Sequence, residues 1–185
     1  MTRRAALAQG LAETVRLVFG LVPRLTAPGP AAIRLSFLAA PLCLGLLAFS
    51  RWVDLRGAPL PAPVWHMVLV QALLFAIGWA GFLLLAHEVL RRTGRLVIWP
   101  ALLTVWNWCN LAQALVQFAA DQSRLVPLPT LLPPIILLVT VFWQIWIEWR
   151  ALRHVLTSLL LAAGLLAADV ALGIFLQSLA TTLGG

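Results

Sequence analysis

The chain has 185 residues, of which 62% are hydrophobic and only 10% are charged, and its mean hydropathy is +0.98. Because a soluble domain carries about 25% charged residues, this composition excludes a soluble globular protein and indicates an integral membrane protein. The net charge of +7 comes from arginines at the ends of apolar segments, where the positive-inside rule places them, and this position argues against nucleic-acid binding. Cys43 and Cys109 lie inside apolar segments without a paired spacing, which predicts free thiols.

Residues 1–30 are predicted to form an amphipathic segment that lies in the membrane interface. Its apolar positions share one face of a helix: Leu7, Leu11, Val15, Val18 and Val22. Gln9, Glu13 and Arg16 share the opposite face, and arginines favour the anionic headgroup region. The alternative is a lead-in helix that packs on the rest of the protein. A cluster of proline and glycine at Pro23 and 28–30 ends the segment.

Residues 31–185 are predicted to form an all-α polytopic bundle of five transmembrane helices. The expected spans are about 31–50, 64–85, 96–120, 131–149 and 155–179. Pro41 is expected to kink the first span. Gln71, Gly78, Gly81 and Glu88 share a face of the second span, so another helix can approach closely there.

The span at 96–120 is unusual because it carries four amides. Asn107, Asn110, Gln113 and Gln117 fall within roughly 120° of one another at the helical period of about 100° per residue. Lipid offers these groups no hydrogen bonds, so they must face protein or water. The stripe either joins helices by hydrogen bonds or lines a wet cavity or ligand path.

The last two spans add polar groups at similar depth. Thr140, Gln144 and Glu148 share one face of the span at 131–149, and three tryptophans share the opposite side: Trp143, Trp146 and Trp149. This tryptophan face is expected to contact lipid or helices rather than stack on a ligand. Asp169 lies near the middle of the span at 155–179, where an ionised carboxylate costs several kcal/mol unless it is paired or wet. It is expected either to form a structural hydrogen bond, as a protonated acid, with an asparagine, or to act as a proton-linked functional group.

The arginines predict the orientation of the bundle. With the N-terminus inside, ten arginines fall on the inner side: Arg3, Arg4, Arg16, Arg24, Arg34, Arg91, Arg92, Arg95, Arg150 and Arg153. Three fall outside: Arg51, Arg56 and Arg124. The asymmetry predicts a cytoplasmic N-terminus and a periplasmic C-terminus in a bacterial inner membrane, and therefore an odd number of spans.

Glu88 and Glu148 are expected at the inner surface in ion pairs with arginines: Arg91, Arg92, Arg95, Arg150 and Arg153. His87 and His154 also fall on this side, but at loop ends rather than inside spans, which argues against haem ligation. No spacing typical of a metal site or of a catalytic motif is present in the sequence, so no cofactor and no catalytic residue is predicted.

Three short stretches carry a family resemblance: Ala76–Phe82 (AIGWAGF), the basic turn Arg91–Arg95 (RRTGR) and the pair Asn107–Trp108. Together with the five closely spaced spans, they resemble small bacterial membrane proteins related to the Yip/Yif five-span family. The resemblance implies a non-enzymatic membrane protein that works through partners. It supplies no catalytic residue.

Two functions follow as expectations. The first is a non-enzymatic scaffold or accessory subunit in the lipid bilayer, acting through helix contacts and a basic inner surface, as a homo-oligomer or as part of a larger complex. The second is a small oligomeric transporter or channel, with the amide stripe along the path and Asp169 as the coupling group. A dry contact between the spans at 96–120 and 155–179 would favour the scaffold, whereas a continuous polar tunnel would favour transport.

Overall fold

The computed structural model describes residues 2–24, 28–54, 63–123 and 129–184, and every regular element in these ranges is a helix. The elements are α1 (Arg3–Val18), α2 (Pro30–Ser36), α3 (Ala39–Asp54), α4 (Val64–Arg92), η1 (Leu96–Ile98), α5 (Trp99–Gln122), α6 (Leu132–Val155) and α7 (Leu159–Gly184). The predicted all-helical class is therefore confirmed for the described part of the chain.

In the part of the chain that the structure describes, four helical segments are long and apolar enough to cross a membrane: Pro30–Ser50, Trp65–Arg92, Leu132–Val155 and Leu159–Ala180. The fifth long helix, α5, has 24 residues and thus sufficient length, since about 20 residues cross the hydrocarbon core. It falls outside this group because its amides dilute its apolar character. The apolar composition thus supports four of the five expected spans.

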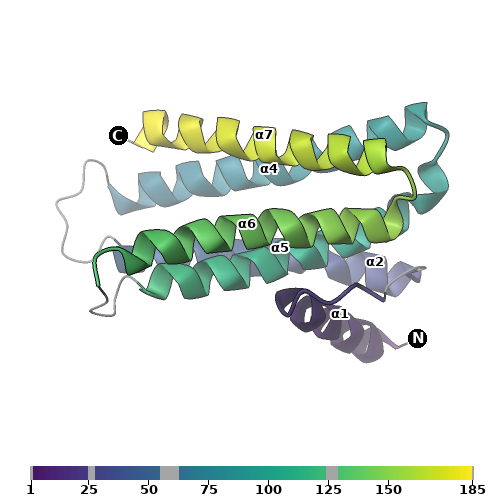
Figure 1. Ribbon diagram of the computed structural model, residues 1–185, viewed down its shortest axis with the longest axis horizontal. Coiled ribbons are helices and arrows are strands. Elements are labelled where there is room, and N and C mark those ends of the chain that lie inside the picture. The colour runs from purple at the N-terminus through teal and green to yellow at the C-terminus, as the bar shows by residue number, and fades with distance from the viewer. Residues whose placement is uncertain (1, 25–27, 55–62, 124–128, 185) are drawn as a thin grey trace.

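The long helices form two layers (Figure 1). Helices α4 and α7 run antiparallel in one layer, and α5 and α6 run antiparallel in the other. Helix α3 packs on α5 and touches α4, while α1 and α2 pack against α5 near one end of the bundle. This arrangement makes α5 the helix with the most neighbours, which explains why its residues from Ala101 to Ala112 are almost all buried.

The two tryptophans in the middle of α5 anchor opposite sides of it. The ring of Trp106 stacks on Phe82 of α4 with 4.4 Å between ring centroids and meets Trp79 edge-on at 5.2 Å. The ring of Trp108 packs against α1 at Gly10. Both rings are at most 3% exposed, so they fix α5 between the other layer and the N-terminal helix.

The expected bend near Pro41 is a break between two helices. Helix α2 ends at Ser36, and α3 begins at Ala39. Pro41 has no backbone N–H and its ring clashes with the carbonyl four residues earlier, at Phe37. The helix is therefore interrupted one turn before the proline, as that geometry requires.

Helix α1 docks on the bundle through its small and polar face. Ala6, Gly10, Glu13 and Leu17 are buried, whereas Leu11 and Val15 on the expected apolar face are 44% and 55% exposed. Glu13 Oε2 accepts a hydrogen bond of 2.9 Å from the backbone N–H of Arg24. The alternative of a helix that packs on the rest of the protein therefore describes α1. Leu7 and Val18 of the expected apolar face also pack against the core, and only the part of that face with Leu11 and Val15 stays exposed.

The arginine-rich turns gather at one end of the bundle. Helix α1, the end of α4 with Arg91 and Arg92, and the turn between α6 and α7 all lie there (Figure 1). Arg150 ties this end together, because its Nη1 donates a 2.6 Å hydrogen bond to the carbonyl of Gly20 after α1. Arg56 and Arg124, two of the arginines assigned to the opposite side, lie outside the described residues.

The close contact between Gly10 of α1 and the Trp108 ring can be tested by replacing glycines with alanine. A Cβ atom at Gly10 would lie 2.2 Å from the Trp108 ring, whereas one at Gly45 of α3 would meet no atom within 4 Å. Alanine favours a helix over glycine by about 0.5–1 kcal/mol, but overpacking costs about 1–3 kcal/mol. We expect Gly10→Ala to lower, and Gly45→Ala to raise, the midpoint of thermal unfolding in detergent. Equal shifts for both variants would contradict the docking of α1 on Trp108.

Candidate functional site: a carboxyl pair in an amide-lined cavity

The polar groups of the bundle converge on two acids from different helices. Glu148 of α6 is 5% exposed, and its carboxyl group lies within hydrogen-bonding reach of the carboxyl group of Asp169 on α7. Trp106 Nε1 donates to Asp169 Oδ2 at 3.4 Å, and Gln113 Nε2 donates to Glu148 Oε2 at 3.4 Å. All of these donors come from α5, which lies against α6.

The pair needs a proton. Two carboxylates in contact do not both stay ionised without a cation, because their charges repel and Glu148 is withdrawn from water. No arginine or histidine of the described chain makes an ion pair or hydrogen bond with either acid. Glu148 Oε1 is buried and receives no hydrogen bond from a donor group in the same ranges. A proton held by one acid and offered to the other supplies the missing donor.

A line of glutamines connects this pair to the end of α5. Gln113 Nε2 also donates to the carbonyl oxygen of Gln144 on α6 at 3.0 Å. Gln144 Nε2 donates to Gln117 Oε1 at 2.9 Å, and Gln117 Nε2 donates to Asp121 Oδ1 at 2.8 Å. The amide side chains thus form a hydrogen-bonded line between α5 and α6, from Asp121 in the last turn of α5 toward Glu148.

Two cavities meet at Asp169. The larger, about 710 Å³, lies between α5, α6 and α7 and is lined by Gln113, Gln117, Gln144 and Glu148 among others. The smaller, about 210 Å³, lies between α4, α5 and α7. Both include three side chains of α7 at a spacing of four: Asp169, Gly173 and Gln177. This spacing places the three residues on one face of the helix.

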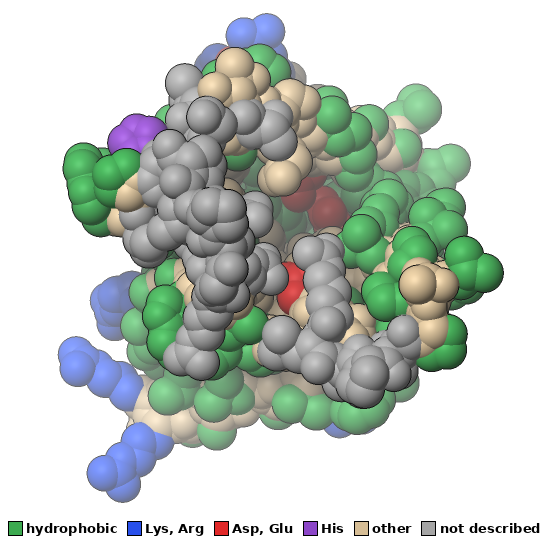
Figure 2. Space-filling view, turned by 90° about the vertical axis from the view of Figure 1, so that its left-hand side faces the viewer, with side chains coloured by type: hydrophobic (Ala, Val, Ile, Leu, Met, Phe, Trp, Pro, Cys, Tyr) green, Lys and Arg blue, Asp and Glu red, His purple; other side chains and the backbone are tan. Residues whose placement is uncertain are grey.

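The hollow is visible from one end of the bundle. Figure 2 looks onto the end where α4 begins and α7 finishes, and acidic side chains are seen inside a depression between the helices. This end is opposite to the arginine-rich turns (Figure 1). The large cavity thus has a mixed lining, in which the acids and glutamines lie beside apolar residues such as Val141 and Val170.

The structure divides the predicted amide stripe. Asn110, Gln113 and Gln117 line one or the other cavity, together with Gln144 and Asp169. Asn107 is different, because it is fully buried and its Nδ2 donates to Ser36 Oγ of α2 at 2.9 Å. Asn107 therefore only joins helices, whereas Gln113 and Gln117 both bond to α6 and line the larger cavity, so the two interpretations of the stripe overlap at these residues.

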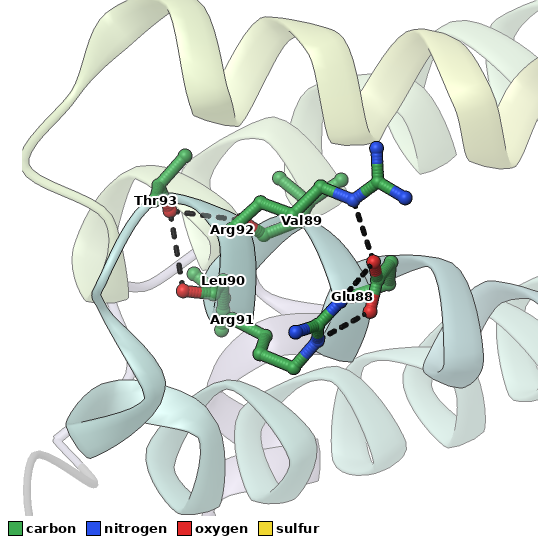
Figure 3. Close-up of polar contacts among 6 residues, drawn as sticks. All are labelled: Glu88, Val89, Leu90, Arg91, Arg92 and Thr93. Atoms are coloured by element: carbon green, nitrogen blue, oxygen red, sulfur yellow. Dashed lines mark hydrogen bonds and ion pairs between the residues drawn. The ribbon is translucent and has the colours of Figure 1, made fainter.

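Of the two acids expected in ion pairs at the inner surface, Glu88 is in such a pair. Glu88 accepts hydrogen bonds of 2.7 Å from both Nε and Nη2 of Arg91 and also bonds Arg92 (Figure 3). Arg95 follows in the turn after α4. Glu88, Arg91 and Arg92 thus form the expected type of ion pair at the surface.

The expected ion pairing of Glu148 with Arg150 and Arg153 is wrong. Residues two positions apart on a helix point about 200° away from each other, so Glu148 and Arg150 face opposite directions. Glu148 therefore turns inward, whereas Arg150 binds the Gly20 carbonyl and Arg153 donates to the carbonyl of Thr157 at 3.0 Å.

The three tryptophans of α6 lie outside both cavities. Trp143 packs against the core, while Trp146 and Trp149 lie under the guanidinium groups of Arg150 and Arg153, at 5.0 and 5.9 Å from the ring centroids. The Trp146 ring also packs against Gly20, the glycine with φ of +67° after α1. The tryptophan face thus supports the arginine end.

Sequence reasoning missed the partnership of Glu148 with Asp169, and it missed Gln177. The sequence did contain a signal for Gln177, because a glycine and a glutamine follow Asp169 at the fourth and eighth positions of an otherwise apolar helix. The sequence contained no signal for the contact between Glu148 and Asp169, since the register of α6 against α7 is a property of the tertiary fold. Among the described residues, no group of three or more acids, histidines and cysteines is placed to hold a metal ion.

Comparisons with protein-family models, with curated proteins and with solved structures found no match. The resemblance to the Yip/Yif family therefore gains no support from them, and the function has to be argued from the site itself.

The shared proton predicts how Glu148 responds to substitution. Glu148→Gln keeps a hydrogen-bonding side chain and removes the conflict between two acids, so the free energy of unfolding should stay equal or rise. Glu148→Ala leaves Gln113 and Asp169 without a partner and should lower it by about 1–3 kcal/mol. Unfolding in detergent measures both variants. A large loss of stability in Glu148→Gln would contradict the shared proton.

Proposed function

We propose that this chain is a small membrane transport protein that couples the passage of a small polar solute to a proton held by Glu148 and Asp169. The observation that supports it is the contact of the two carboxyl groups at a cavity of about 710 Å³, which both acids and several glutamines line. Ionisable groups inside a membrane segment are costly to bury and commonly belong to ion or substrate pathways. A chain selected only for helix packing gains nothing from two acids in contact.

The cavities also favour transport over the scaffold interpretation. A scaffold was expected to show a dry contact between α5 and α7. Instead, Asp169 of α7 borders both cavities, and the helices on either side of it contribute amide side chains that can bind a polar solute. A volume of about 710 Å³ falls within the range of small-molecule sites, which is about 300–1,000 Å³. The proposal includes no chemical conversion of the solute.

The proposal places the protein in a bacterial inner membrane with five spans. Helix α5 then crosses the bilayer as the central span, because its amides face cavities and other helices and need no contact with lipid. The arginine-rich end faces the cytoplasm, and the cavity opens toward the periplasm. The exposed apolar face of α1, with Leu11, Val15 and Phe19, lies in the interface beside the bundle.

Oligomerisation completes the proposal. A bundle of this size has few helices with which to enclose a pathway on both sides, and the outer surface of α7 offers large exposed apolar residues such as Leu160 and Phe175. We therefore expect the working form to be a homo-oligomer in which the bundles pack through such lipid-facing surfaces.

A test uses vesicles that contain the purified protein, an internal pH-sensitive dye and a preset pH gradient. Separate vesicle samples receive amines, amino acids, sugars or organic acids, and the rate of gradient dissipation is recorded. We expect at least one class to dissipate the gradient with the wild type and at least tenfold more slowly with Asp169→Asn. If no class moves protons with the wild type, the transport proposal is wrong and the scaffold interpretation takes its place.

Two glycines of α7 provide a matched pair for the same assay. A Cβ atom at Gly164 or at Gly173 would meet no atom within 4 Å, but only Gly173 lines the cavities. We expect Gly173→Leu to block transport by filling the junction of the cavities, while Gly164→Leu keeps a rate within about twofold of the wild type, as surface substitutions usually do. Equal rates for the two variants would show that the cavities are not the path.

A further inference from the structure

The smaller cavity has the composition of a site for an organic cation. We propose that it binds a small organic ammonium ion that carries an oxygen acceptor, and that each bound cation displaces one proton from the Glu148–Asp169 pair. The inference rests on the proposed function, because it names the solute class of the same site. It is carried by the aromatic side chains, the carboxyl group and the unpaired N–H that line this cavity.

Three aromatic rings and one acid line the cavity together: Phe75, Trp79, Trp106 and Asp169. Phe75 and Trp79 have ring centroids 5.5 Å apart, and Trp79 and Trp106 have theirs 5.2 Å apart. A cation close to such rings is attracted by their negative faces, and the attraction grows when water is excluded. The carboxyl group supplies the opposite charge. Aromatic rings around a single acid therefore favour an organic cation over an anion or a sugar.

Trp79 adds a requirement for an acceptor. This residue is 9% exposed, and its Nε1–H, which can only donate, has no acceptor among the described residues. A buried N–H without a partner is costly, so a ligand that brings an oxygen atom to it gains affinity. The amides of Gln71, Asn110 and Gln177 line the same cavity and can bind the same oxygen. A simple metal cation would leave the Trp79 N–H unpaired.

The size of the cavity limits the ligand. Its volume is about 210 Å³, below the range of about 300–1,000 Å³ that accommodates drug-sized molecules. A small ammonium ion with a short hydroxyl or carboxyl arm fits this space. The larger cavity, which shares Asp169 with the smaller one, provides the route by which a proton leaves.

Charge balance sets the stoichiometry. Besides the proton shared between the two acids, the pair without a bound cation holds a second proton and is neutral. With the shared proton alone, the pair carries a single negative charge. A monovalent cation binds the singly charged pair, so loading it from the neutral state breaks one O–H bond and transfers that proton to water in the larger cavity. The buried site is neutral before and after the exchange, and this avoids the cost of a net charge in the membrane.

The other groups near the pair do not supply the compensating charge. Helix α5 contributes the buried Cys109 thiol together with Trp106 and Gln113, and α4 contributes Trp79 and Gln71. In the described ranges, no basic side chain from α4, α5, α6 or α7 bonds to either acid. The proton and the incoming cation are therefore the positive charges that stabilise the pair.

Choline and its neutral isostere 3,3-dimethylbutan-1-ol test the proposal on the full-length protein in detergent. Calorimetry measures their dissociation constants, and a pH electrode in weak buffer counts the protons released. We expect choline to bind, to release about one proton per molecule bound, and to bind at least tenfold more tightly than the isostere. Asp169→Asn should abolish the proton release. Equal binding of the isostere, or choline binding without proton release, would overturn the proposal.

Matched tryptophan variants on α4 test the aromatic site. Trp79→Leu should weaken choline binding about tenfold, and Trp79→Phe, which keeps a ring, should weaken it less. Trp65→Leu is the control, since Trp65 is 68% exposed and lies outside the cavity. Equal affinity for Trp79→Leu and Trp65→Leu would overturn the aromatic site. If Trp79→Leu does not fold, Gly173→Leu against Gly164→Leu gives the same comparison, because only the former fills the cavity.

The outcomes separate this inference from the proposed function. If another solute class dissipates the pH gradient in vesicles while choline does not bind, the ammonium site is wrong and transport stands. If choline binds with proton release but no solute crosses the vesicle membrane, the ammonium site stands and transport is wrong.

Discussion

The contact between Glu148 and Asp169 is the constraint on which the rest of the arrangement depends. Two acids that meet inside a bundle with an apolar exterior need a proton, donors for their remaining oxygens, or water. Trp106 and Gln113 supply the donors, and the cavities on either side of Asp169 supply room for water or solute. Helix α5 holds both donors, which gives a reason for amides in a helix that is buried along most of its length.

The fold has one closely packed end and one hollow end. At the arginine end, Arg150 reaches the Gly20 carbonyl, Gly10 admits the Trp108 ring, and α1 and α2 close against α5. At the other end, α5 and α6 are bridged by amide side chains, and the larger cavity is lined by both acids. Figure 2 shows acidic side chains in the depression at this end. Such an asymmetry suits a site that is reached from one side at a time.

The sequence predicted the helical class, most helix positions and the inward orientation of the polar groups, because lipid leaves few alternatives for amides and acids. Helical periodicity brought Asn110, Gln113 and Gln117 to the correct side of α5. It could not pair Glu148 with Asp169, since the rotation and register of α6 against α7 depend on tertiary packing. The neighbouring arginines suggested a surface position for Glu148, although the helical angle between Glu148 and Arg150 already argued against it. Helical periodicity also could not show that the Asn107 side chain bonds to Ser36 of α2.

The most direct test of the account is whether water reaches the junction of the two cavities. A cysteine is introduced at Gly173 or at Gly164 in a background with Cys43→Ala and Cys109→Ala, and vesicles are treated with a membrane-impermeant thiol reagent. The account predicts that Gly173→Cys reacts, that choline slows the reaction, and that Gly164→Cys, which lies outside both cavities, stays unreacted. A Gly173→Cys protein as inert as the Gly164→Cys protein would contradict the claim that a wet polar cavity reaches the acid pair.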